Sequence, residues 1–89
     1  MNDLLWQSVT MNGIPVGRVI DVILDGEEKV MGYEIRCEDG QYRFLPRAAA
    51  AIDGTTIEIA SPLALLDTDQ LEFYRLRGTR LRRREEPAA

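Results

Sequence analysis

The chain has 89 residues, a formal net charge of −4, one cysteine and no histidine. A chain of this length forms one domain and buries only about 60 to 65% of the surface that its unfolded form exposes, so its core is small. One cysteine excludes an internal disulfide, and the lack of histidine excludes a conventional zinc or copper site and a histidine-dependent triad. No apolar run approaches the roughly 20 residues of a membrane span, and residues 1–10 lack the features of a signal peptide, so we expect a cytoplasmic protein without a transmembrane segment.

The charges of the chain are separated along its length. Residues 1–74 carry five basic and thirteen acidic side chains, whereas residues 75–89 carry six arginines and two glutamates. The main part of the chain and its C-terminal part therefore have opposite signs.

Four two-residue turn motifs divide the chain between residues 12 and 54 into segments of similar length. Asn-Gly and Asp-Gly accept the positive φ angles of a type I′ turn and are the strongest short-range predictors of a hairpin. The motifs are Asn12-Gly13, Asp25-Gly26, Asp39-Gly40 and Asp53-Gly54. Their regular spacing predicts a meander of antiparallel strands.

The segments between these turns have the apolar patterns of short strands. The predicted strands cover residues 4–11, 15–24, 29–37, 41–45 and 55–60. The second strand is apolar on one face and half apolar on the other, where Val19 and Ile23 alternate with Asp21. We therefore expect both of its faces to be covered, by the C-terminal segment or by a second subunit. Residues 47–51, which include four alanines, are predicted to form a turn of helix or a tight connector.

A helix is predicted over residues 67–78. Asp67 is a suitable N-cap, and Gln70 three residues later forms a variant of the capping box. Acidic side chains lie near the start of this segment and arginines near its end, which suits the helix dipole. Gly78 is well placed to end the helix.

Short strands in so small a chain leave exposed edges unless the sheet closes on itself or pairs with another copy. We therefore expect a mainly β fold, in which an antiparallel barrel of five to six strands, closed or partly closed, precedes a short C-terminal α-helix. An open sheet with the helix on one face is the alternative. The barrel is assigned to residues 1–66, the helix to 67–78 and a basic, flexible tail to 79–89.

Three segments resemble the PRC-barrel domain. They are Gly-Ile-Pro-Val-Gly-Arg-Val-Ile-Asp-Val at residues 13–22, Val-Met-Gly-Tyr-Glu-Ile at 30–35 and Phe-Leu-Pro at 44–46. That family includes the cytoplasmic domain of the photosynthetic reaction-centre H subunit and the C-terminal domain of the ribosome maturation factor RimM. The resemblance covers roughly residues 4–61. It implies a small, strongly bent PRC-type β-barrel that serves as a docking module and has no known catalytic residues.

No group of residues has the pattern of an active site. Asp21 belongs to an acidic group around one turn, with Asp25, Glu27 and Glu28, but these residues do not reproduce the ligand spacing of a calcium loop, and a solvated acidic turn explains them. Cys37 has the inward parity of its strand, where a thiol is normally inert, and no histidine is present to activate it. We therefore expect no catalytic residue, no metal and no cofactor.

The C-terminal arginines are the one group with a functional alternative. Pairing with acidic side chains of the same chain or of a neighbouring subunit explains them as structural residues. They also suit phosphate binding, with a salt-dependent affinity for RNA, or association with an anionic membrane surface. These arginines are Arg75, Arg77, Arg80, Arg82, Arg83 and Arg84.

These observations together predict a non-catalytic protein–protein interaction module, or adaptor, that forms a homodimer and docks an unidentified protein partner. The two-sided apolar strand and the aromatic residues motivate the predicted interface. An RNA- or ribosome-associated factor that uses the arginines is the alternative function. The predicted interface residues are Trp6, Val19, Ile23, Phe73 and Tyr74.

Overall fold

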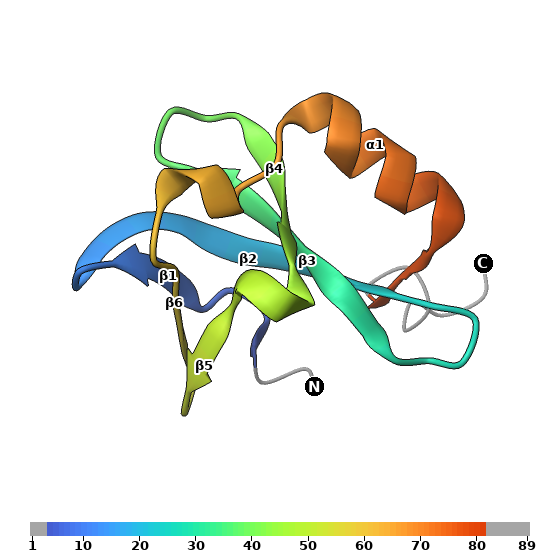
Figure 1. Ribbon diagram of the computed structural model, residues 1–89, viewed down its shortest axis with the longest axis horizontal. Coiled ribbons are helices and arrows are strands. Elements are labelled where there is room, and N and C mark those ends of the chain that lie inside the picture. Colours follow the sequence, from blue (N-terminus) through green and yellow to red (C-terminus); the bar gives the residue numbers. More distant parts are fainter. Residues whose placement is uncertain (1–3, 82–89) are drawn as a thin grey trace.

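The computed structural model describes residues 4–81 and contains one curved β-sheet with a single α-helix packed on it (Figure 1). The strands are β1 (Ser8–Met11), β2 (Ile14–Leu24), β3 (Val30–Cys37), β4 (Tyr42–Pro46), β5 (Ala51–Asp53), β6 (Thr56–Glu58) and β7 (Thr79–Arg80). The helices are α1 (Thr68–Arg77) and the short 3₁₀ turns η2 (Arg47–Ala49) and η3 (Pro62–Ala64). No helix in this part of the chain combines the length and the apolar character needed to cross a membrane.

The sheet is open, and the prediction of a closed barrel is wrong. The strands follow the order β4-β3-β2-β1-β6-β5, with β7 added to β2. The outer edge of β4 is occupied by Leu66, because its backbone exchanges hydrogen bonds of 2.8 and 2.9 Å with Phe44. Closure of the barrel at this edge is therefore prevented, and the alternative of an open sheet with the helix on one face is confirmed.

The antiparallel meander extends only from β1 to β4. The chain then crosses to the other end of the sheet, where β5 and β6 form a hairpin and β6 pairs in parallel with β1. The sequence patterns predicted one strand over residues 55–60 and did not predict β5. Residues 47–51 include the predicted helical turn, η2.

Three of the four turn glycines have the expected positive φ. Asn12 and Gly13 both have it, at 54° and 78°, which is the pattern of a type I′ turn. At the turn after β2, Gly26 does not, and Glu28 has a φ of 67° instead. Asp25 shapes this loop, because its Oδ1 accepts hydrogen bonds from the backbone N–H groups of Glu27 and Lys29 at 2.8 and 2.9 Å.

A β-bulge in β2 changes which way its side chains face. Val19 pairs with Ile35, and Asp21 pairs with Glu34, so Ile20 is the extra residue of the bulge. A bulge of this kind turns two successive side chains towards the same face of the sheet. Asp21 is consequently brought opposite Glu34, on the face that the C-terminal segment covers.

Two apolar clusters lie on either side of the sheet. The larger cluster fills its curved interior and includes Val19 and Leu81. The smaller cluster lies beneath α1 and consists of Ile23, Phe44 and Leu71, with the ring of Tyr74 stacked on Phe44 at a centroid distance of 4.1 Å. The prediction that the C-terminal segment covers the second face of β2 is confirmed at Ile23, whereas Val19, which was predicted to share that face, lies in the larger cluster on the opposite side of the sheet.

The helix α1 has the predicted ends. Asp67 caps it, because its Oδ1 accepts a hydrogen bond of 3.1 Å from the backbone N–H of Gln70. Gly78 follows the last turn with an extended φ of −115°, so left-handed geometry is not its role. A Cβ atom at Gly78 would lie 2.5 Å from Ile23 Cγ2 and 2.7 Å from the Leu24 carbonyl oxygen, so the chain passes β2 where only glycine fits.

The segment after Gly78 belongs to the fold, contrary to the prediction of a flexible tail from residue 79. Thr79 and Arg80 form β7 and pair with the end of β2. Leu81 is buried, with 6% of its surface exposed. The remainder of the predicted tail, residues 82–89, lies outside the described residues.

Candidate functional site

Two carboxylates are buried on neighbouring strands. Asp21 on β2 and Glu34 on β3 are cross-strand partners, and each is only 1% exposed. The prediction that Asp21 belongs to a solvated acidic turn is therefore wrong. A buried carboxylate is very costly unless it is paired with a charge and hydrogen-bonded, so the surroundings of these two side chains matter for the whole fold.

Arginines of the C-terminal segment provide the pairing. Arg75 on α1 donates from Nε to Glu34 Oε1 at 2.6 Å, and this hydrogen bond raises the pKa of Arg75. Arg80 on β7 donates to Glu34 Oε2 at 3.2 Å and to Asp21 Oδ2 at 3.0 Å. Arg75 also pairs with Glu72 on its own helix. These two guanidinium groups fasten the C-terminal segment to the sheet.

The predicted arginine cluster is therefore divided in its roles. Arg75 and Arg80 are held by carboxylates of their own chain. Arg77 lies over the ring of Phe73, with its Cζ 4.8 Å from the ring centroid. The three others, Arg82, Arg83 and Arg84, lie outside the described residues.

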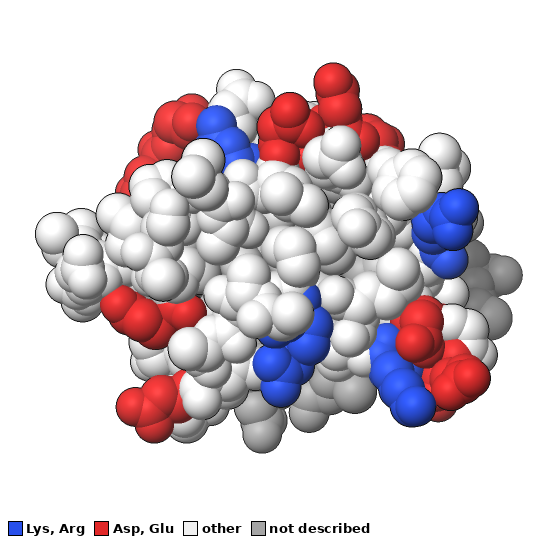
Figure 2. Space-filling view, viewed as in Figure 1, with Lys and Arg blue, Asp and Glu red and all other residues white. Residues whose placement is uncertain are grey.

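The outer face of α1 exposes large apolar side chains. Phe73 is 47% exposed and Leu76 is 88% exposed, and their spacing of three residues makes them neighbours on the helix surface. Asp69 precedes Phe73 by one turn and Arg77 follows it by one turn, and both are exposed. In Figure 2, acidic atoms gather over the beginning of α1 and basic atoms lie at its end, while most of the visible face between the charged groups is uncharged.

The predicted interface residues differ in how far they are exposed. Val19 and Ile23 are fully buried within their own chain and present no surface to a partner. Tyr74 is partly buried, with its ring stacked on Phe44, whereas about half of the surface of Trp6 and of Phe73 is exposed. Leu76 was not among the predicted residues, although its position three residues after Phe73 on the predicted helix would have identified it.

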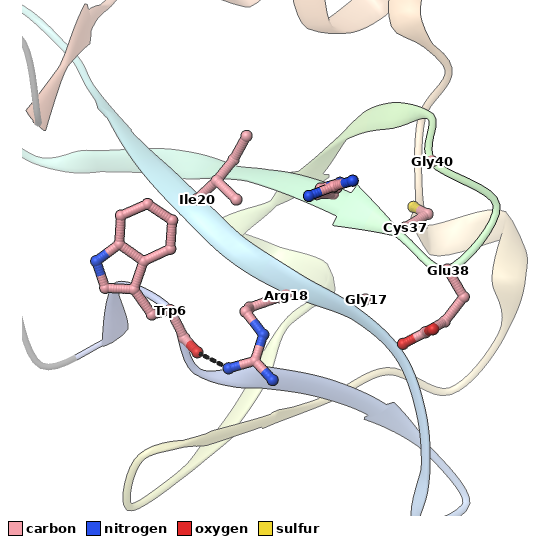
Figure 3. Close-up of a pocket in the computed structure, with 8 residues that line it drawn as sticks. Trp6, Gly17, Arg18, Ile20, Cys37, Glu38 and Gly40 are labelled. Carbon is pink, nitrogen blue, oxygen red and sulfur yellow. Dashed lines mark hydrogen bonds between the residues drawn. The ribbon is translucent and has the colours of Figure 1, made fainter.

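A hollow of about 270 Å³ lies on the outer face of β2 and β3, on the same face as the buried carboxylates. Figure 3 shows the ring of Trp6 beside Ile20, with Arg18 reaching from β2 towards the backbone of Trp6. Arg18 Nη1 donates to the Trp6 carbonyl oxygen at 2.6 Å. Cys37, Glu38 and Gly40 lie at the other end of the hollow.

Two other side chains that could take part in a reaction, a cysteine and an aspartate, are buried or paired. Cys37 is buried, as its strand parity predicted. Asp39 pairs with Arg43 at 3.0 Å in the turn between β3 and β4, and this hydrogen bond lowers the pKa of Asp39. Within residues 4–81, no three histidine, cysteine or carboxylate side chains converge as a metal site would require.

The comparisons with known proteins add no relative. No protein-family model matches the chain, and no curated protein matches it. The function is therefore inferred from the geometry of these surfaces.

Proposed function

We propose that this chain is a non-catalytic, PRC-barrel-like docking module of the cytoplasm that forms a homodimer through the outer face of α1. The exposure of Phe73 and Leu76 on one side of a helix whose other side is packed on the sheet carries this proposal. Small domains have limited cores of their own, and large exposed apolar side chains in one patch are typical of an interaction surface. The resemblance to the PRC-barrel family depends on the sequence segments at residues 13–22, 30–35 and 44–46, and the sheet itself is open.

The charges on α1 favour a second copy of the same chain as the occupant of this surface. Asp69 lies on one side of Phe73 and Arg77 on the other along the outer face of the helix. If two copies of α1 pack antiparallel about a two-fold axis, Phe73 meets its counterpart near the axis, and each Asp69 lies opposite the Arg77 of the other copy. A two-fold contact requires self-complementarity of this kind.

Substitution of the apolar residues tests the interface. We expect Phe73→Glu and Leu76→Glu to produce monomers in sedimentation equilibrium at concentrations where the unchanged chain is a dimer. Leu63→Glu is the matched control, because Leu63 on η3 is also 88% exposed but lies on a different element. An unchanged chain that remains monomeric at high micromolar concentration would overturn the dimer proposal.

Charge reversal tests the orientation of the two helices. Asp69→Arg alone places two positive charges opposite each other in the antiparallel contact, and Arg77→Asp alone places two negative charges there. We expect each variant to be monomeric and an equimolar mixture of the two to form a heterodimer, because both charge pairs are restored in the mixture. Failure of the mixture to associate would contradict the antiparallel arrangement.

An RNA- or ribosome-associated factor remains the alternative. Arg75 and Arg80 no longer support it, because Glu34 and Asp21 hold them. Among the described residues, Arg77 is the one arginine of the cluster that is not held in this way. The alternative predicts that the chain binds RNA at low salt and that glutamine at positions 80, 82, 83 and 84 weakens this binding. A plot of the logarithm of the binding constant against the logarithm of the salt concentration should then become less steep, by about one unit of slope for each phosphate group that is no longer neutralised. Because Arg80 is structural, Arg77→Gln tests this alternative without disturbing the buried ion pairs, and its oligomeric state is measured alongside because Arg77 also lies in the proposed contact of α1.

A further inference from the structure

The backbone of Trp6 has a conformation that its own residue type disfavours. Residues 4–7 form a turn in which the Gln7 N–H donates to the Leu4 carbonyl oxygen at 3.2 Å, and Trp6, the third residue, has a φ of 69°. Glycine or asparagine is the usual residue at such a position. Non-glycine residues with a positive φ outside ordinary turn sequences occur preferentially at functional sites.

Neighbouring groups hold Trp6 in this conformation. Its N–H donates to the Val19 carbonyl oxygen at 2.7 Å, and its carbonyl oxygen accepts the 2.6 Å hydrogen bond from Arg18. The side chain is nevertheless 49% exposed. The turn therefore presents an aromatic ring at the edge of the hollow.

The floor of the hollow contains two arginines that face each other. Arg18 on β2 and Arg36 on β3 are direct cross-strand partners, and both are exposed. Like charges in this arrangement destabilise a sheet. None of the ion pairs formed within residues 4–81 involves either of them, whereas Arg75 and Arg80 on the same face are neutralised by Glu34 and Asp21.

The hollow combines this positive charge with apolar walls. Ile20 lines it because the bulge in β2 turns the side chain to this face, and bulges occur often beside binding sites. Gly17 allows the strands to approach closely, since a Cβ there would lie 2.7 Å from Ile35 Cγ2. The carboxylate of Glu38 also lines the hollow and can accept hydrogen bonds from a ligand's amino or hydroxyl group.

We propose that this hollow binds a small anion that carries a planar ring, of the size of a nucleoside monophosphate. The ring stacks on Trp6, and the phosphate accepts hydrogen bonds from Arg18 and Arg36, whose repulsion it relieves. A hollow of about 270 Å³ is slightly smaller than the usual range for ligand sites, which begins at about 300 Å³, so it favours a ligand no larger than a single nucleotide. This site lies on the sheet and does not depend on the dimer contact of α1.

The intrinsic fluorescence of the protein tests the proposal directly, because Trp6 is its single tryptophan. Adenosine 5′-monophosphate is titrated into the full chain, with excitation at a wavelength that adenine does not absorb. We expect saturable quenching that weakens as salt is added. Arg36→Gln should weaken binding about tenfold or more, as expected for loss of a charge-assisted hydrogen bond. Arg47→Gln removes the same charge from an exposed position on η2, outside the hollow, and should leave the affinity unchanged.

Adenosine and inorganic phosphate separate the two parts of the recognition. We expect each alone to bind at least tenfold more weakly than the monophosphate. Equal affinity for inorganic phosphate would overturn the role of Trp6, and equal affinity for adenosine would overturn the role of the arginines. Absence of saturable quenching at low salt, or an equal effect of the two arginine variants, would overturn the proposal as a whole.

Discussion

Glu34 is the acceptor shared by Arg75 and Arg80, so this one side chain connects β3 to both α1 and β7. Each of its carboxylate oxygens is used by a different arginine. Removing one partner from a buried ion pair leaves an uncompensated charge and costs about 3 to 5 kcal/mol. Because Arg80 keeps Asp21 and Arg75 keeps Glu72, the loss here falls towards the lower end of that range.

We therefore expect Glu34→Gln to lower the free energy of unfolding by about 3 kcal/mol, measured by urea denaturation at neutral pH. Glu27→Gln is the control, because Glu27 pairs with Lys29 at 3.4 Å on the surface and exposed pairs contribute less than about 1 kcal/mol. Similar small losses in the two variants would show that the buried ion pairs do not hold the C-terminal segment.

Glycine at position 78 is required by space and not by backbone conformation. Gly78→Ala places a methyl group against Ile23 and the backbone of Leu24, and forced overpacking typically costs about 1 to 3 kcal/mol. Gly26→Ala provides the matched comparison, since a Cβ at Gly26 meets nothing within 4 Å and its φ is not positive. We expect thermal denaturation to show a clear loss for the first variant and none for the second. Equal melting temperatures would refute the close approach at Gly78.

Among the elements, the parallel pair β1–β6 is held by a side chain as well as by its backbone. Glu58 on β6 accepts hydrogen bonds from the hydroxyl of Thr10 on β1 and, at 2.6 Å, from the backbone N–H of Asn12. The hydrogen bond from Thr10 is the main cause that holds the pKa of Glu58 below its usual value of 4.5. The folded state therefore binds this proton less readily than the unfolded state does.

A carboxylate with a lowered pKa stabilises the fold fully above its unfolded pKa and loses this contribution as the pH falls through its folded pKa. We expect the free energy of unfolding to decrease as the pH falls below about 4.5. Glu58→Gln should be less stable than the unchanged chain at neutral pH, and the difference should shrink in acid. Urea denaturation from neutral to acidic pH measures it. A difference that stays constant with pH would exclude this role for Glu58.

The elements that could be predicted from the sequence are those with local causes. Turn motifs and alternating apolar residues located β1 to β4, and the cap at Asp67 located the start of α1. The order of the strands could not be predicted, because the contact of β6 with β1 joins residues far apart in the chain. The loop after β2 differs from the predicted type I′ turn at Asp25-Gly26. Asp25 accepts hydrogen bonds from two backbone N–H groups, and the positive φ is at Glu28.

The buried carboxylates and the hollow both depend on the bulge in β2, which no residue type in the sequence predicts. The strand β2 was predicted, but the extra residue Ile20 decides that Asp21 faces Glu34. The sequence predicts that the arginines near the C-terminus pair with acidic residues, but it does not identify Asp21 and Glu34 as those residues. The opposition of Arg18 and Arg36 likewise required the register of the β2–β3 pair.

At the scale of the whole molecule, association and stability are linked. A folded dimer that dissociates on unfolding gains stability as its concentration rises. We expect the urea midpoint of the unchanged chain to increase with protein concentration, whereas the midpoint of Phe73→Glu should not change. A midpoint of the unchanged chain that is independent of concentration across the micromolar range would argue against the dimer.

The ion pairs at Glu34 and Asp21 also bear on the timing of folding during synthesis. Both carboxylates leave the ribosome well before Arg75 and Arg80, since translation proceeds from the N-terminus. Until those arginines emerge, Glu34 lacks both of the guanidinium groups that pair with it, so burial of its carboxylate is unfavourable at that stage. We therefore expect the C-terminal segment to pack on this face of the sheet only after Arg80 has left the ribosome.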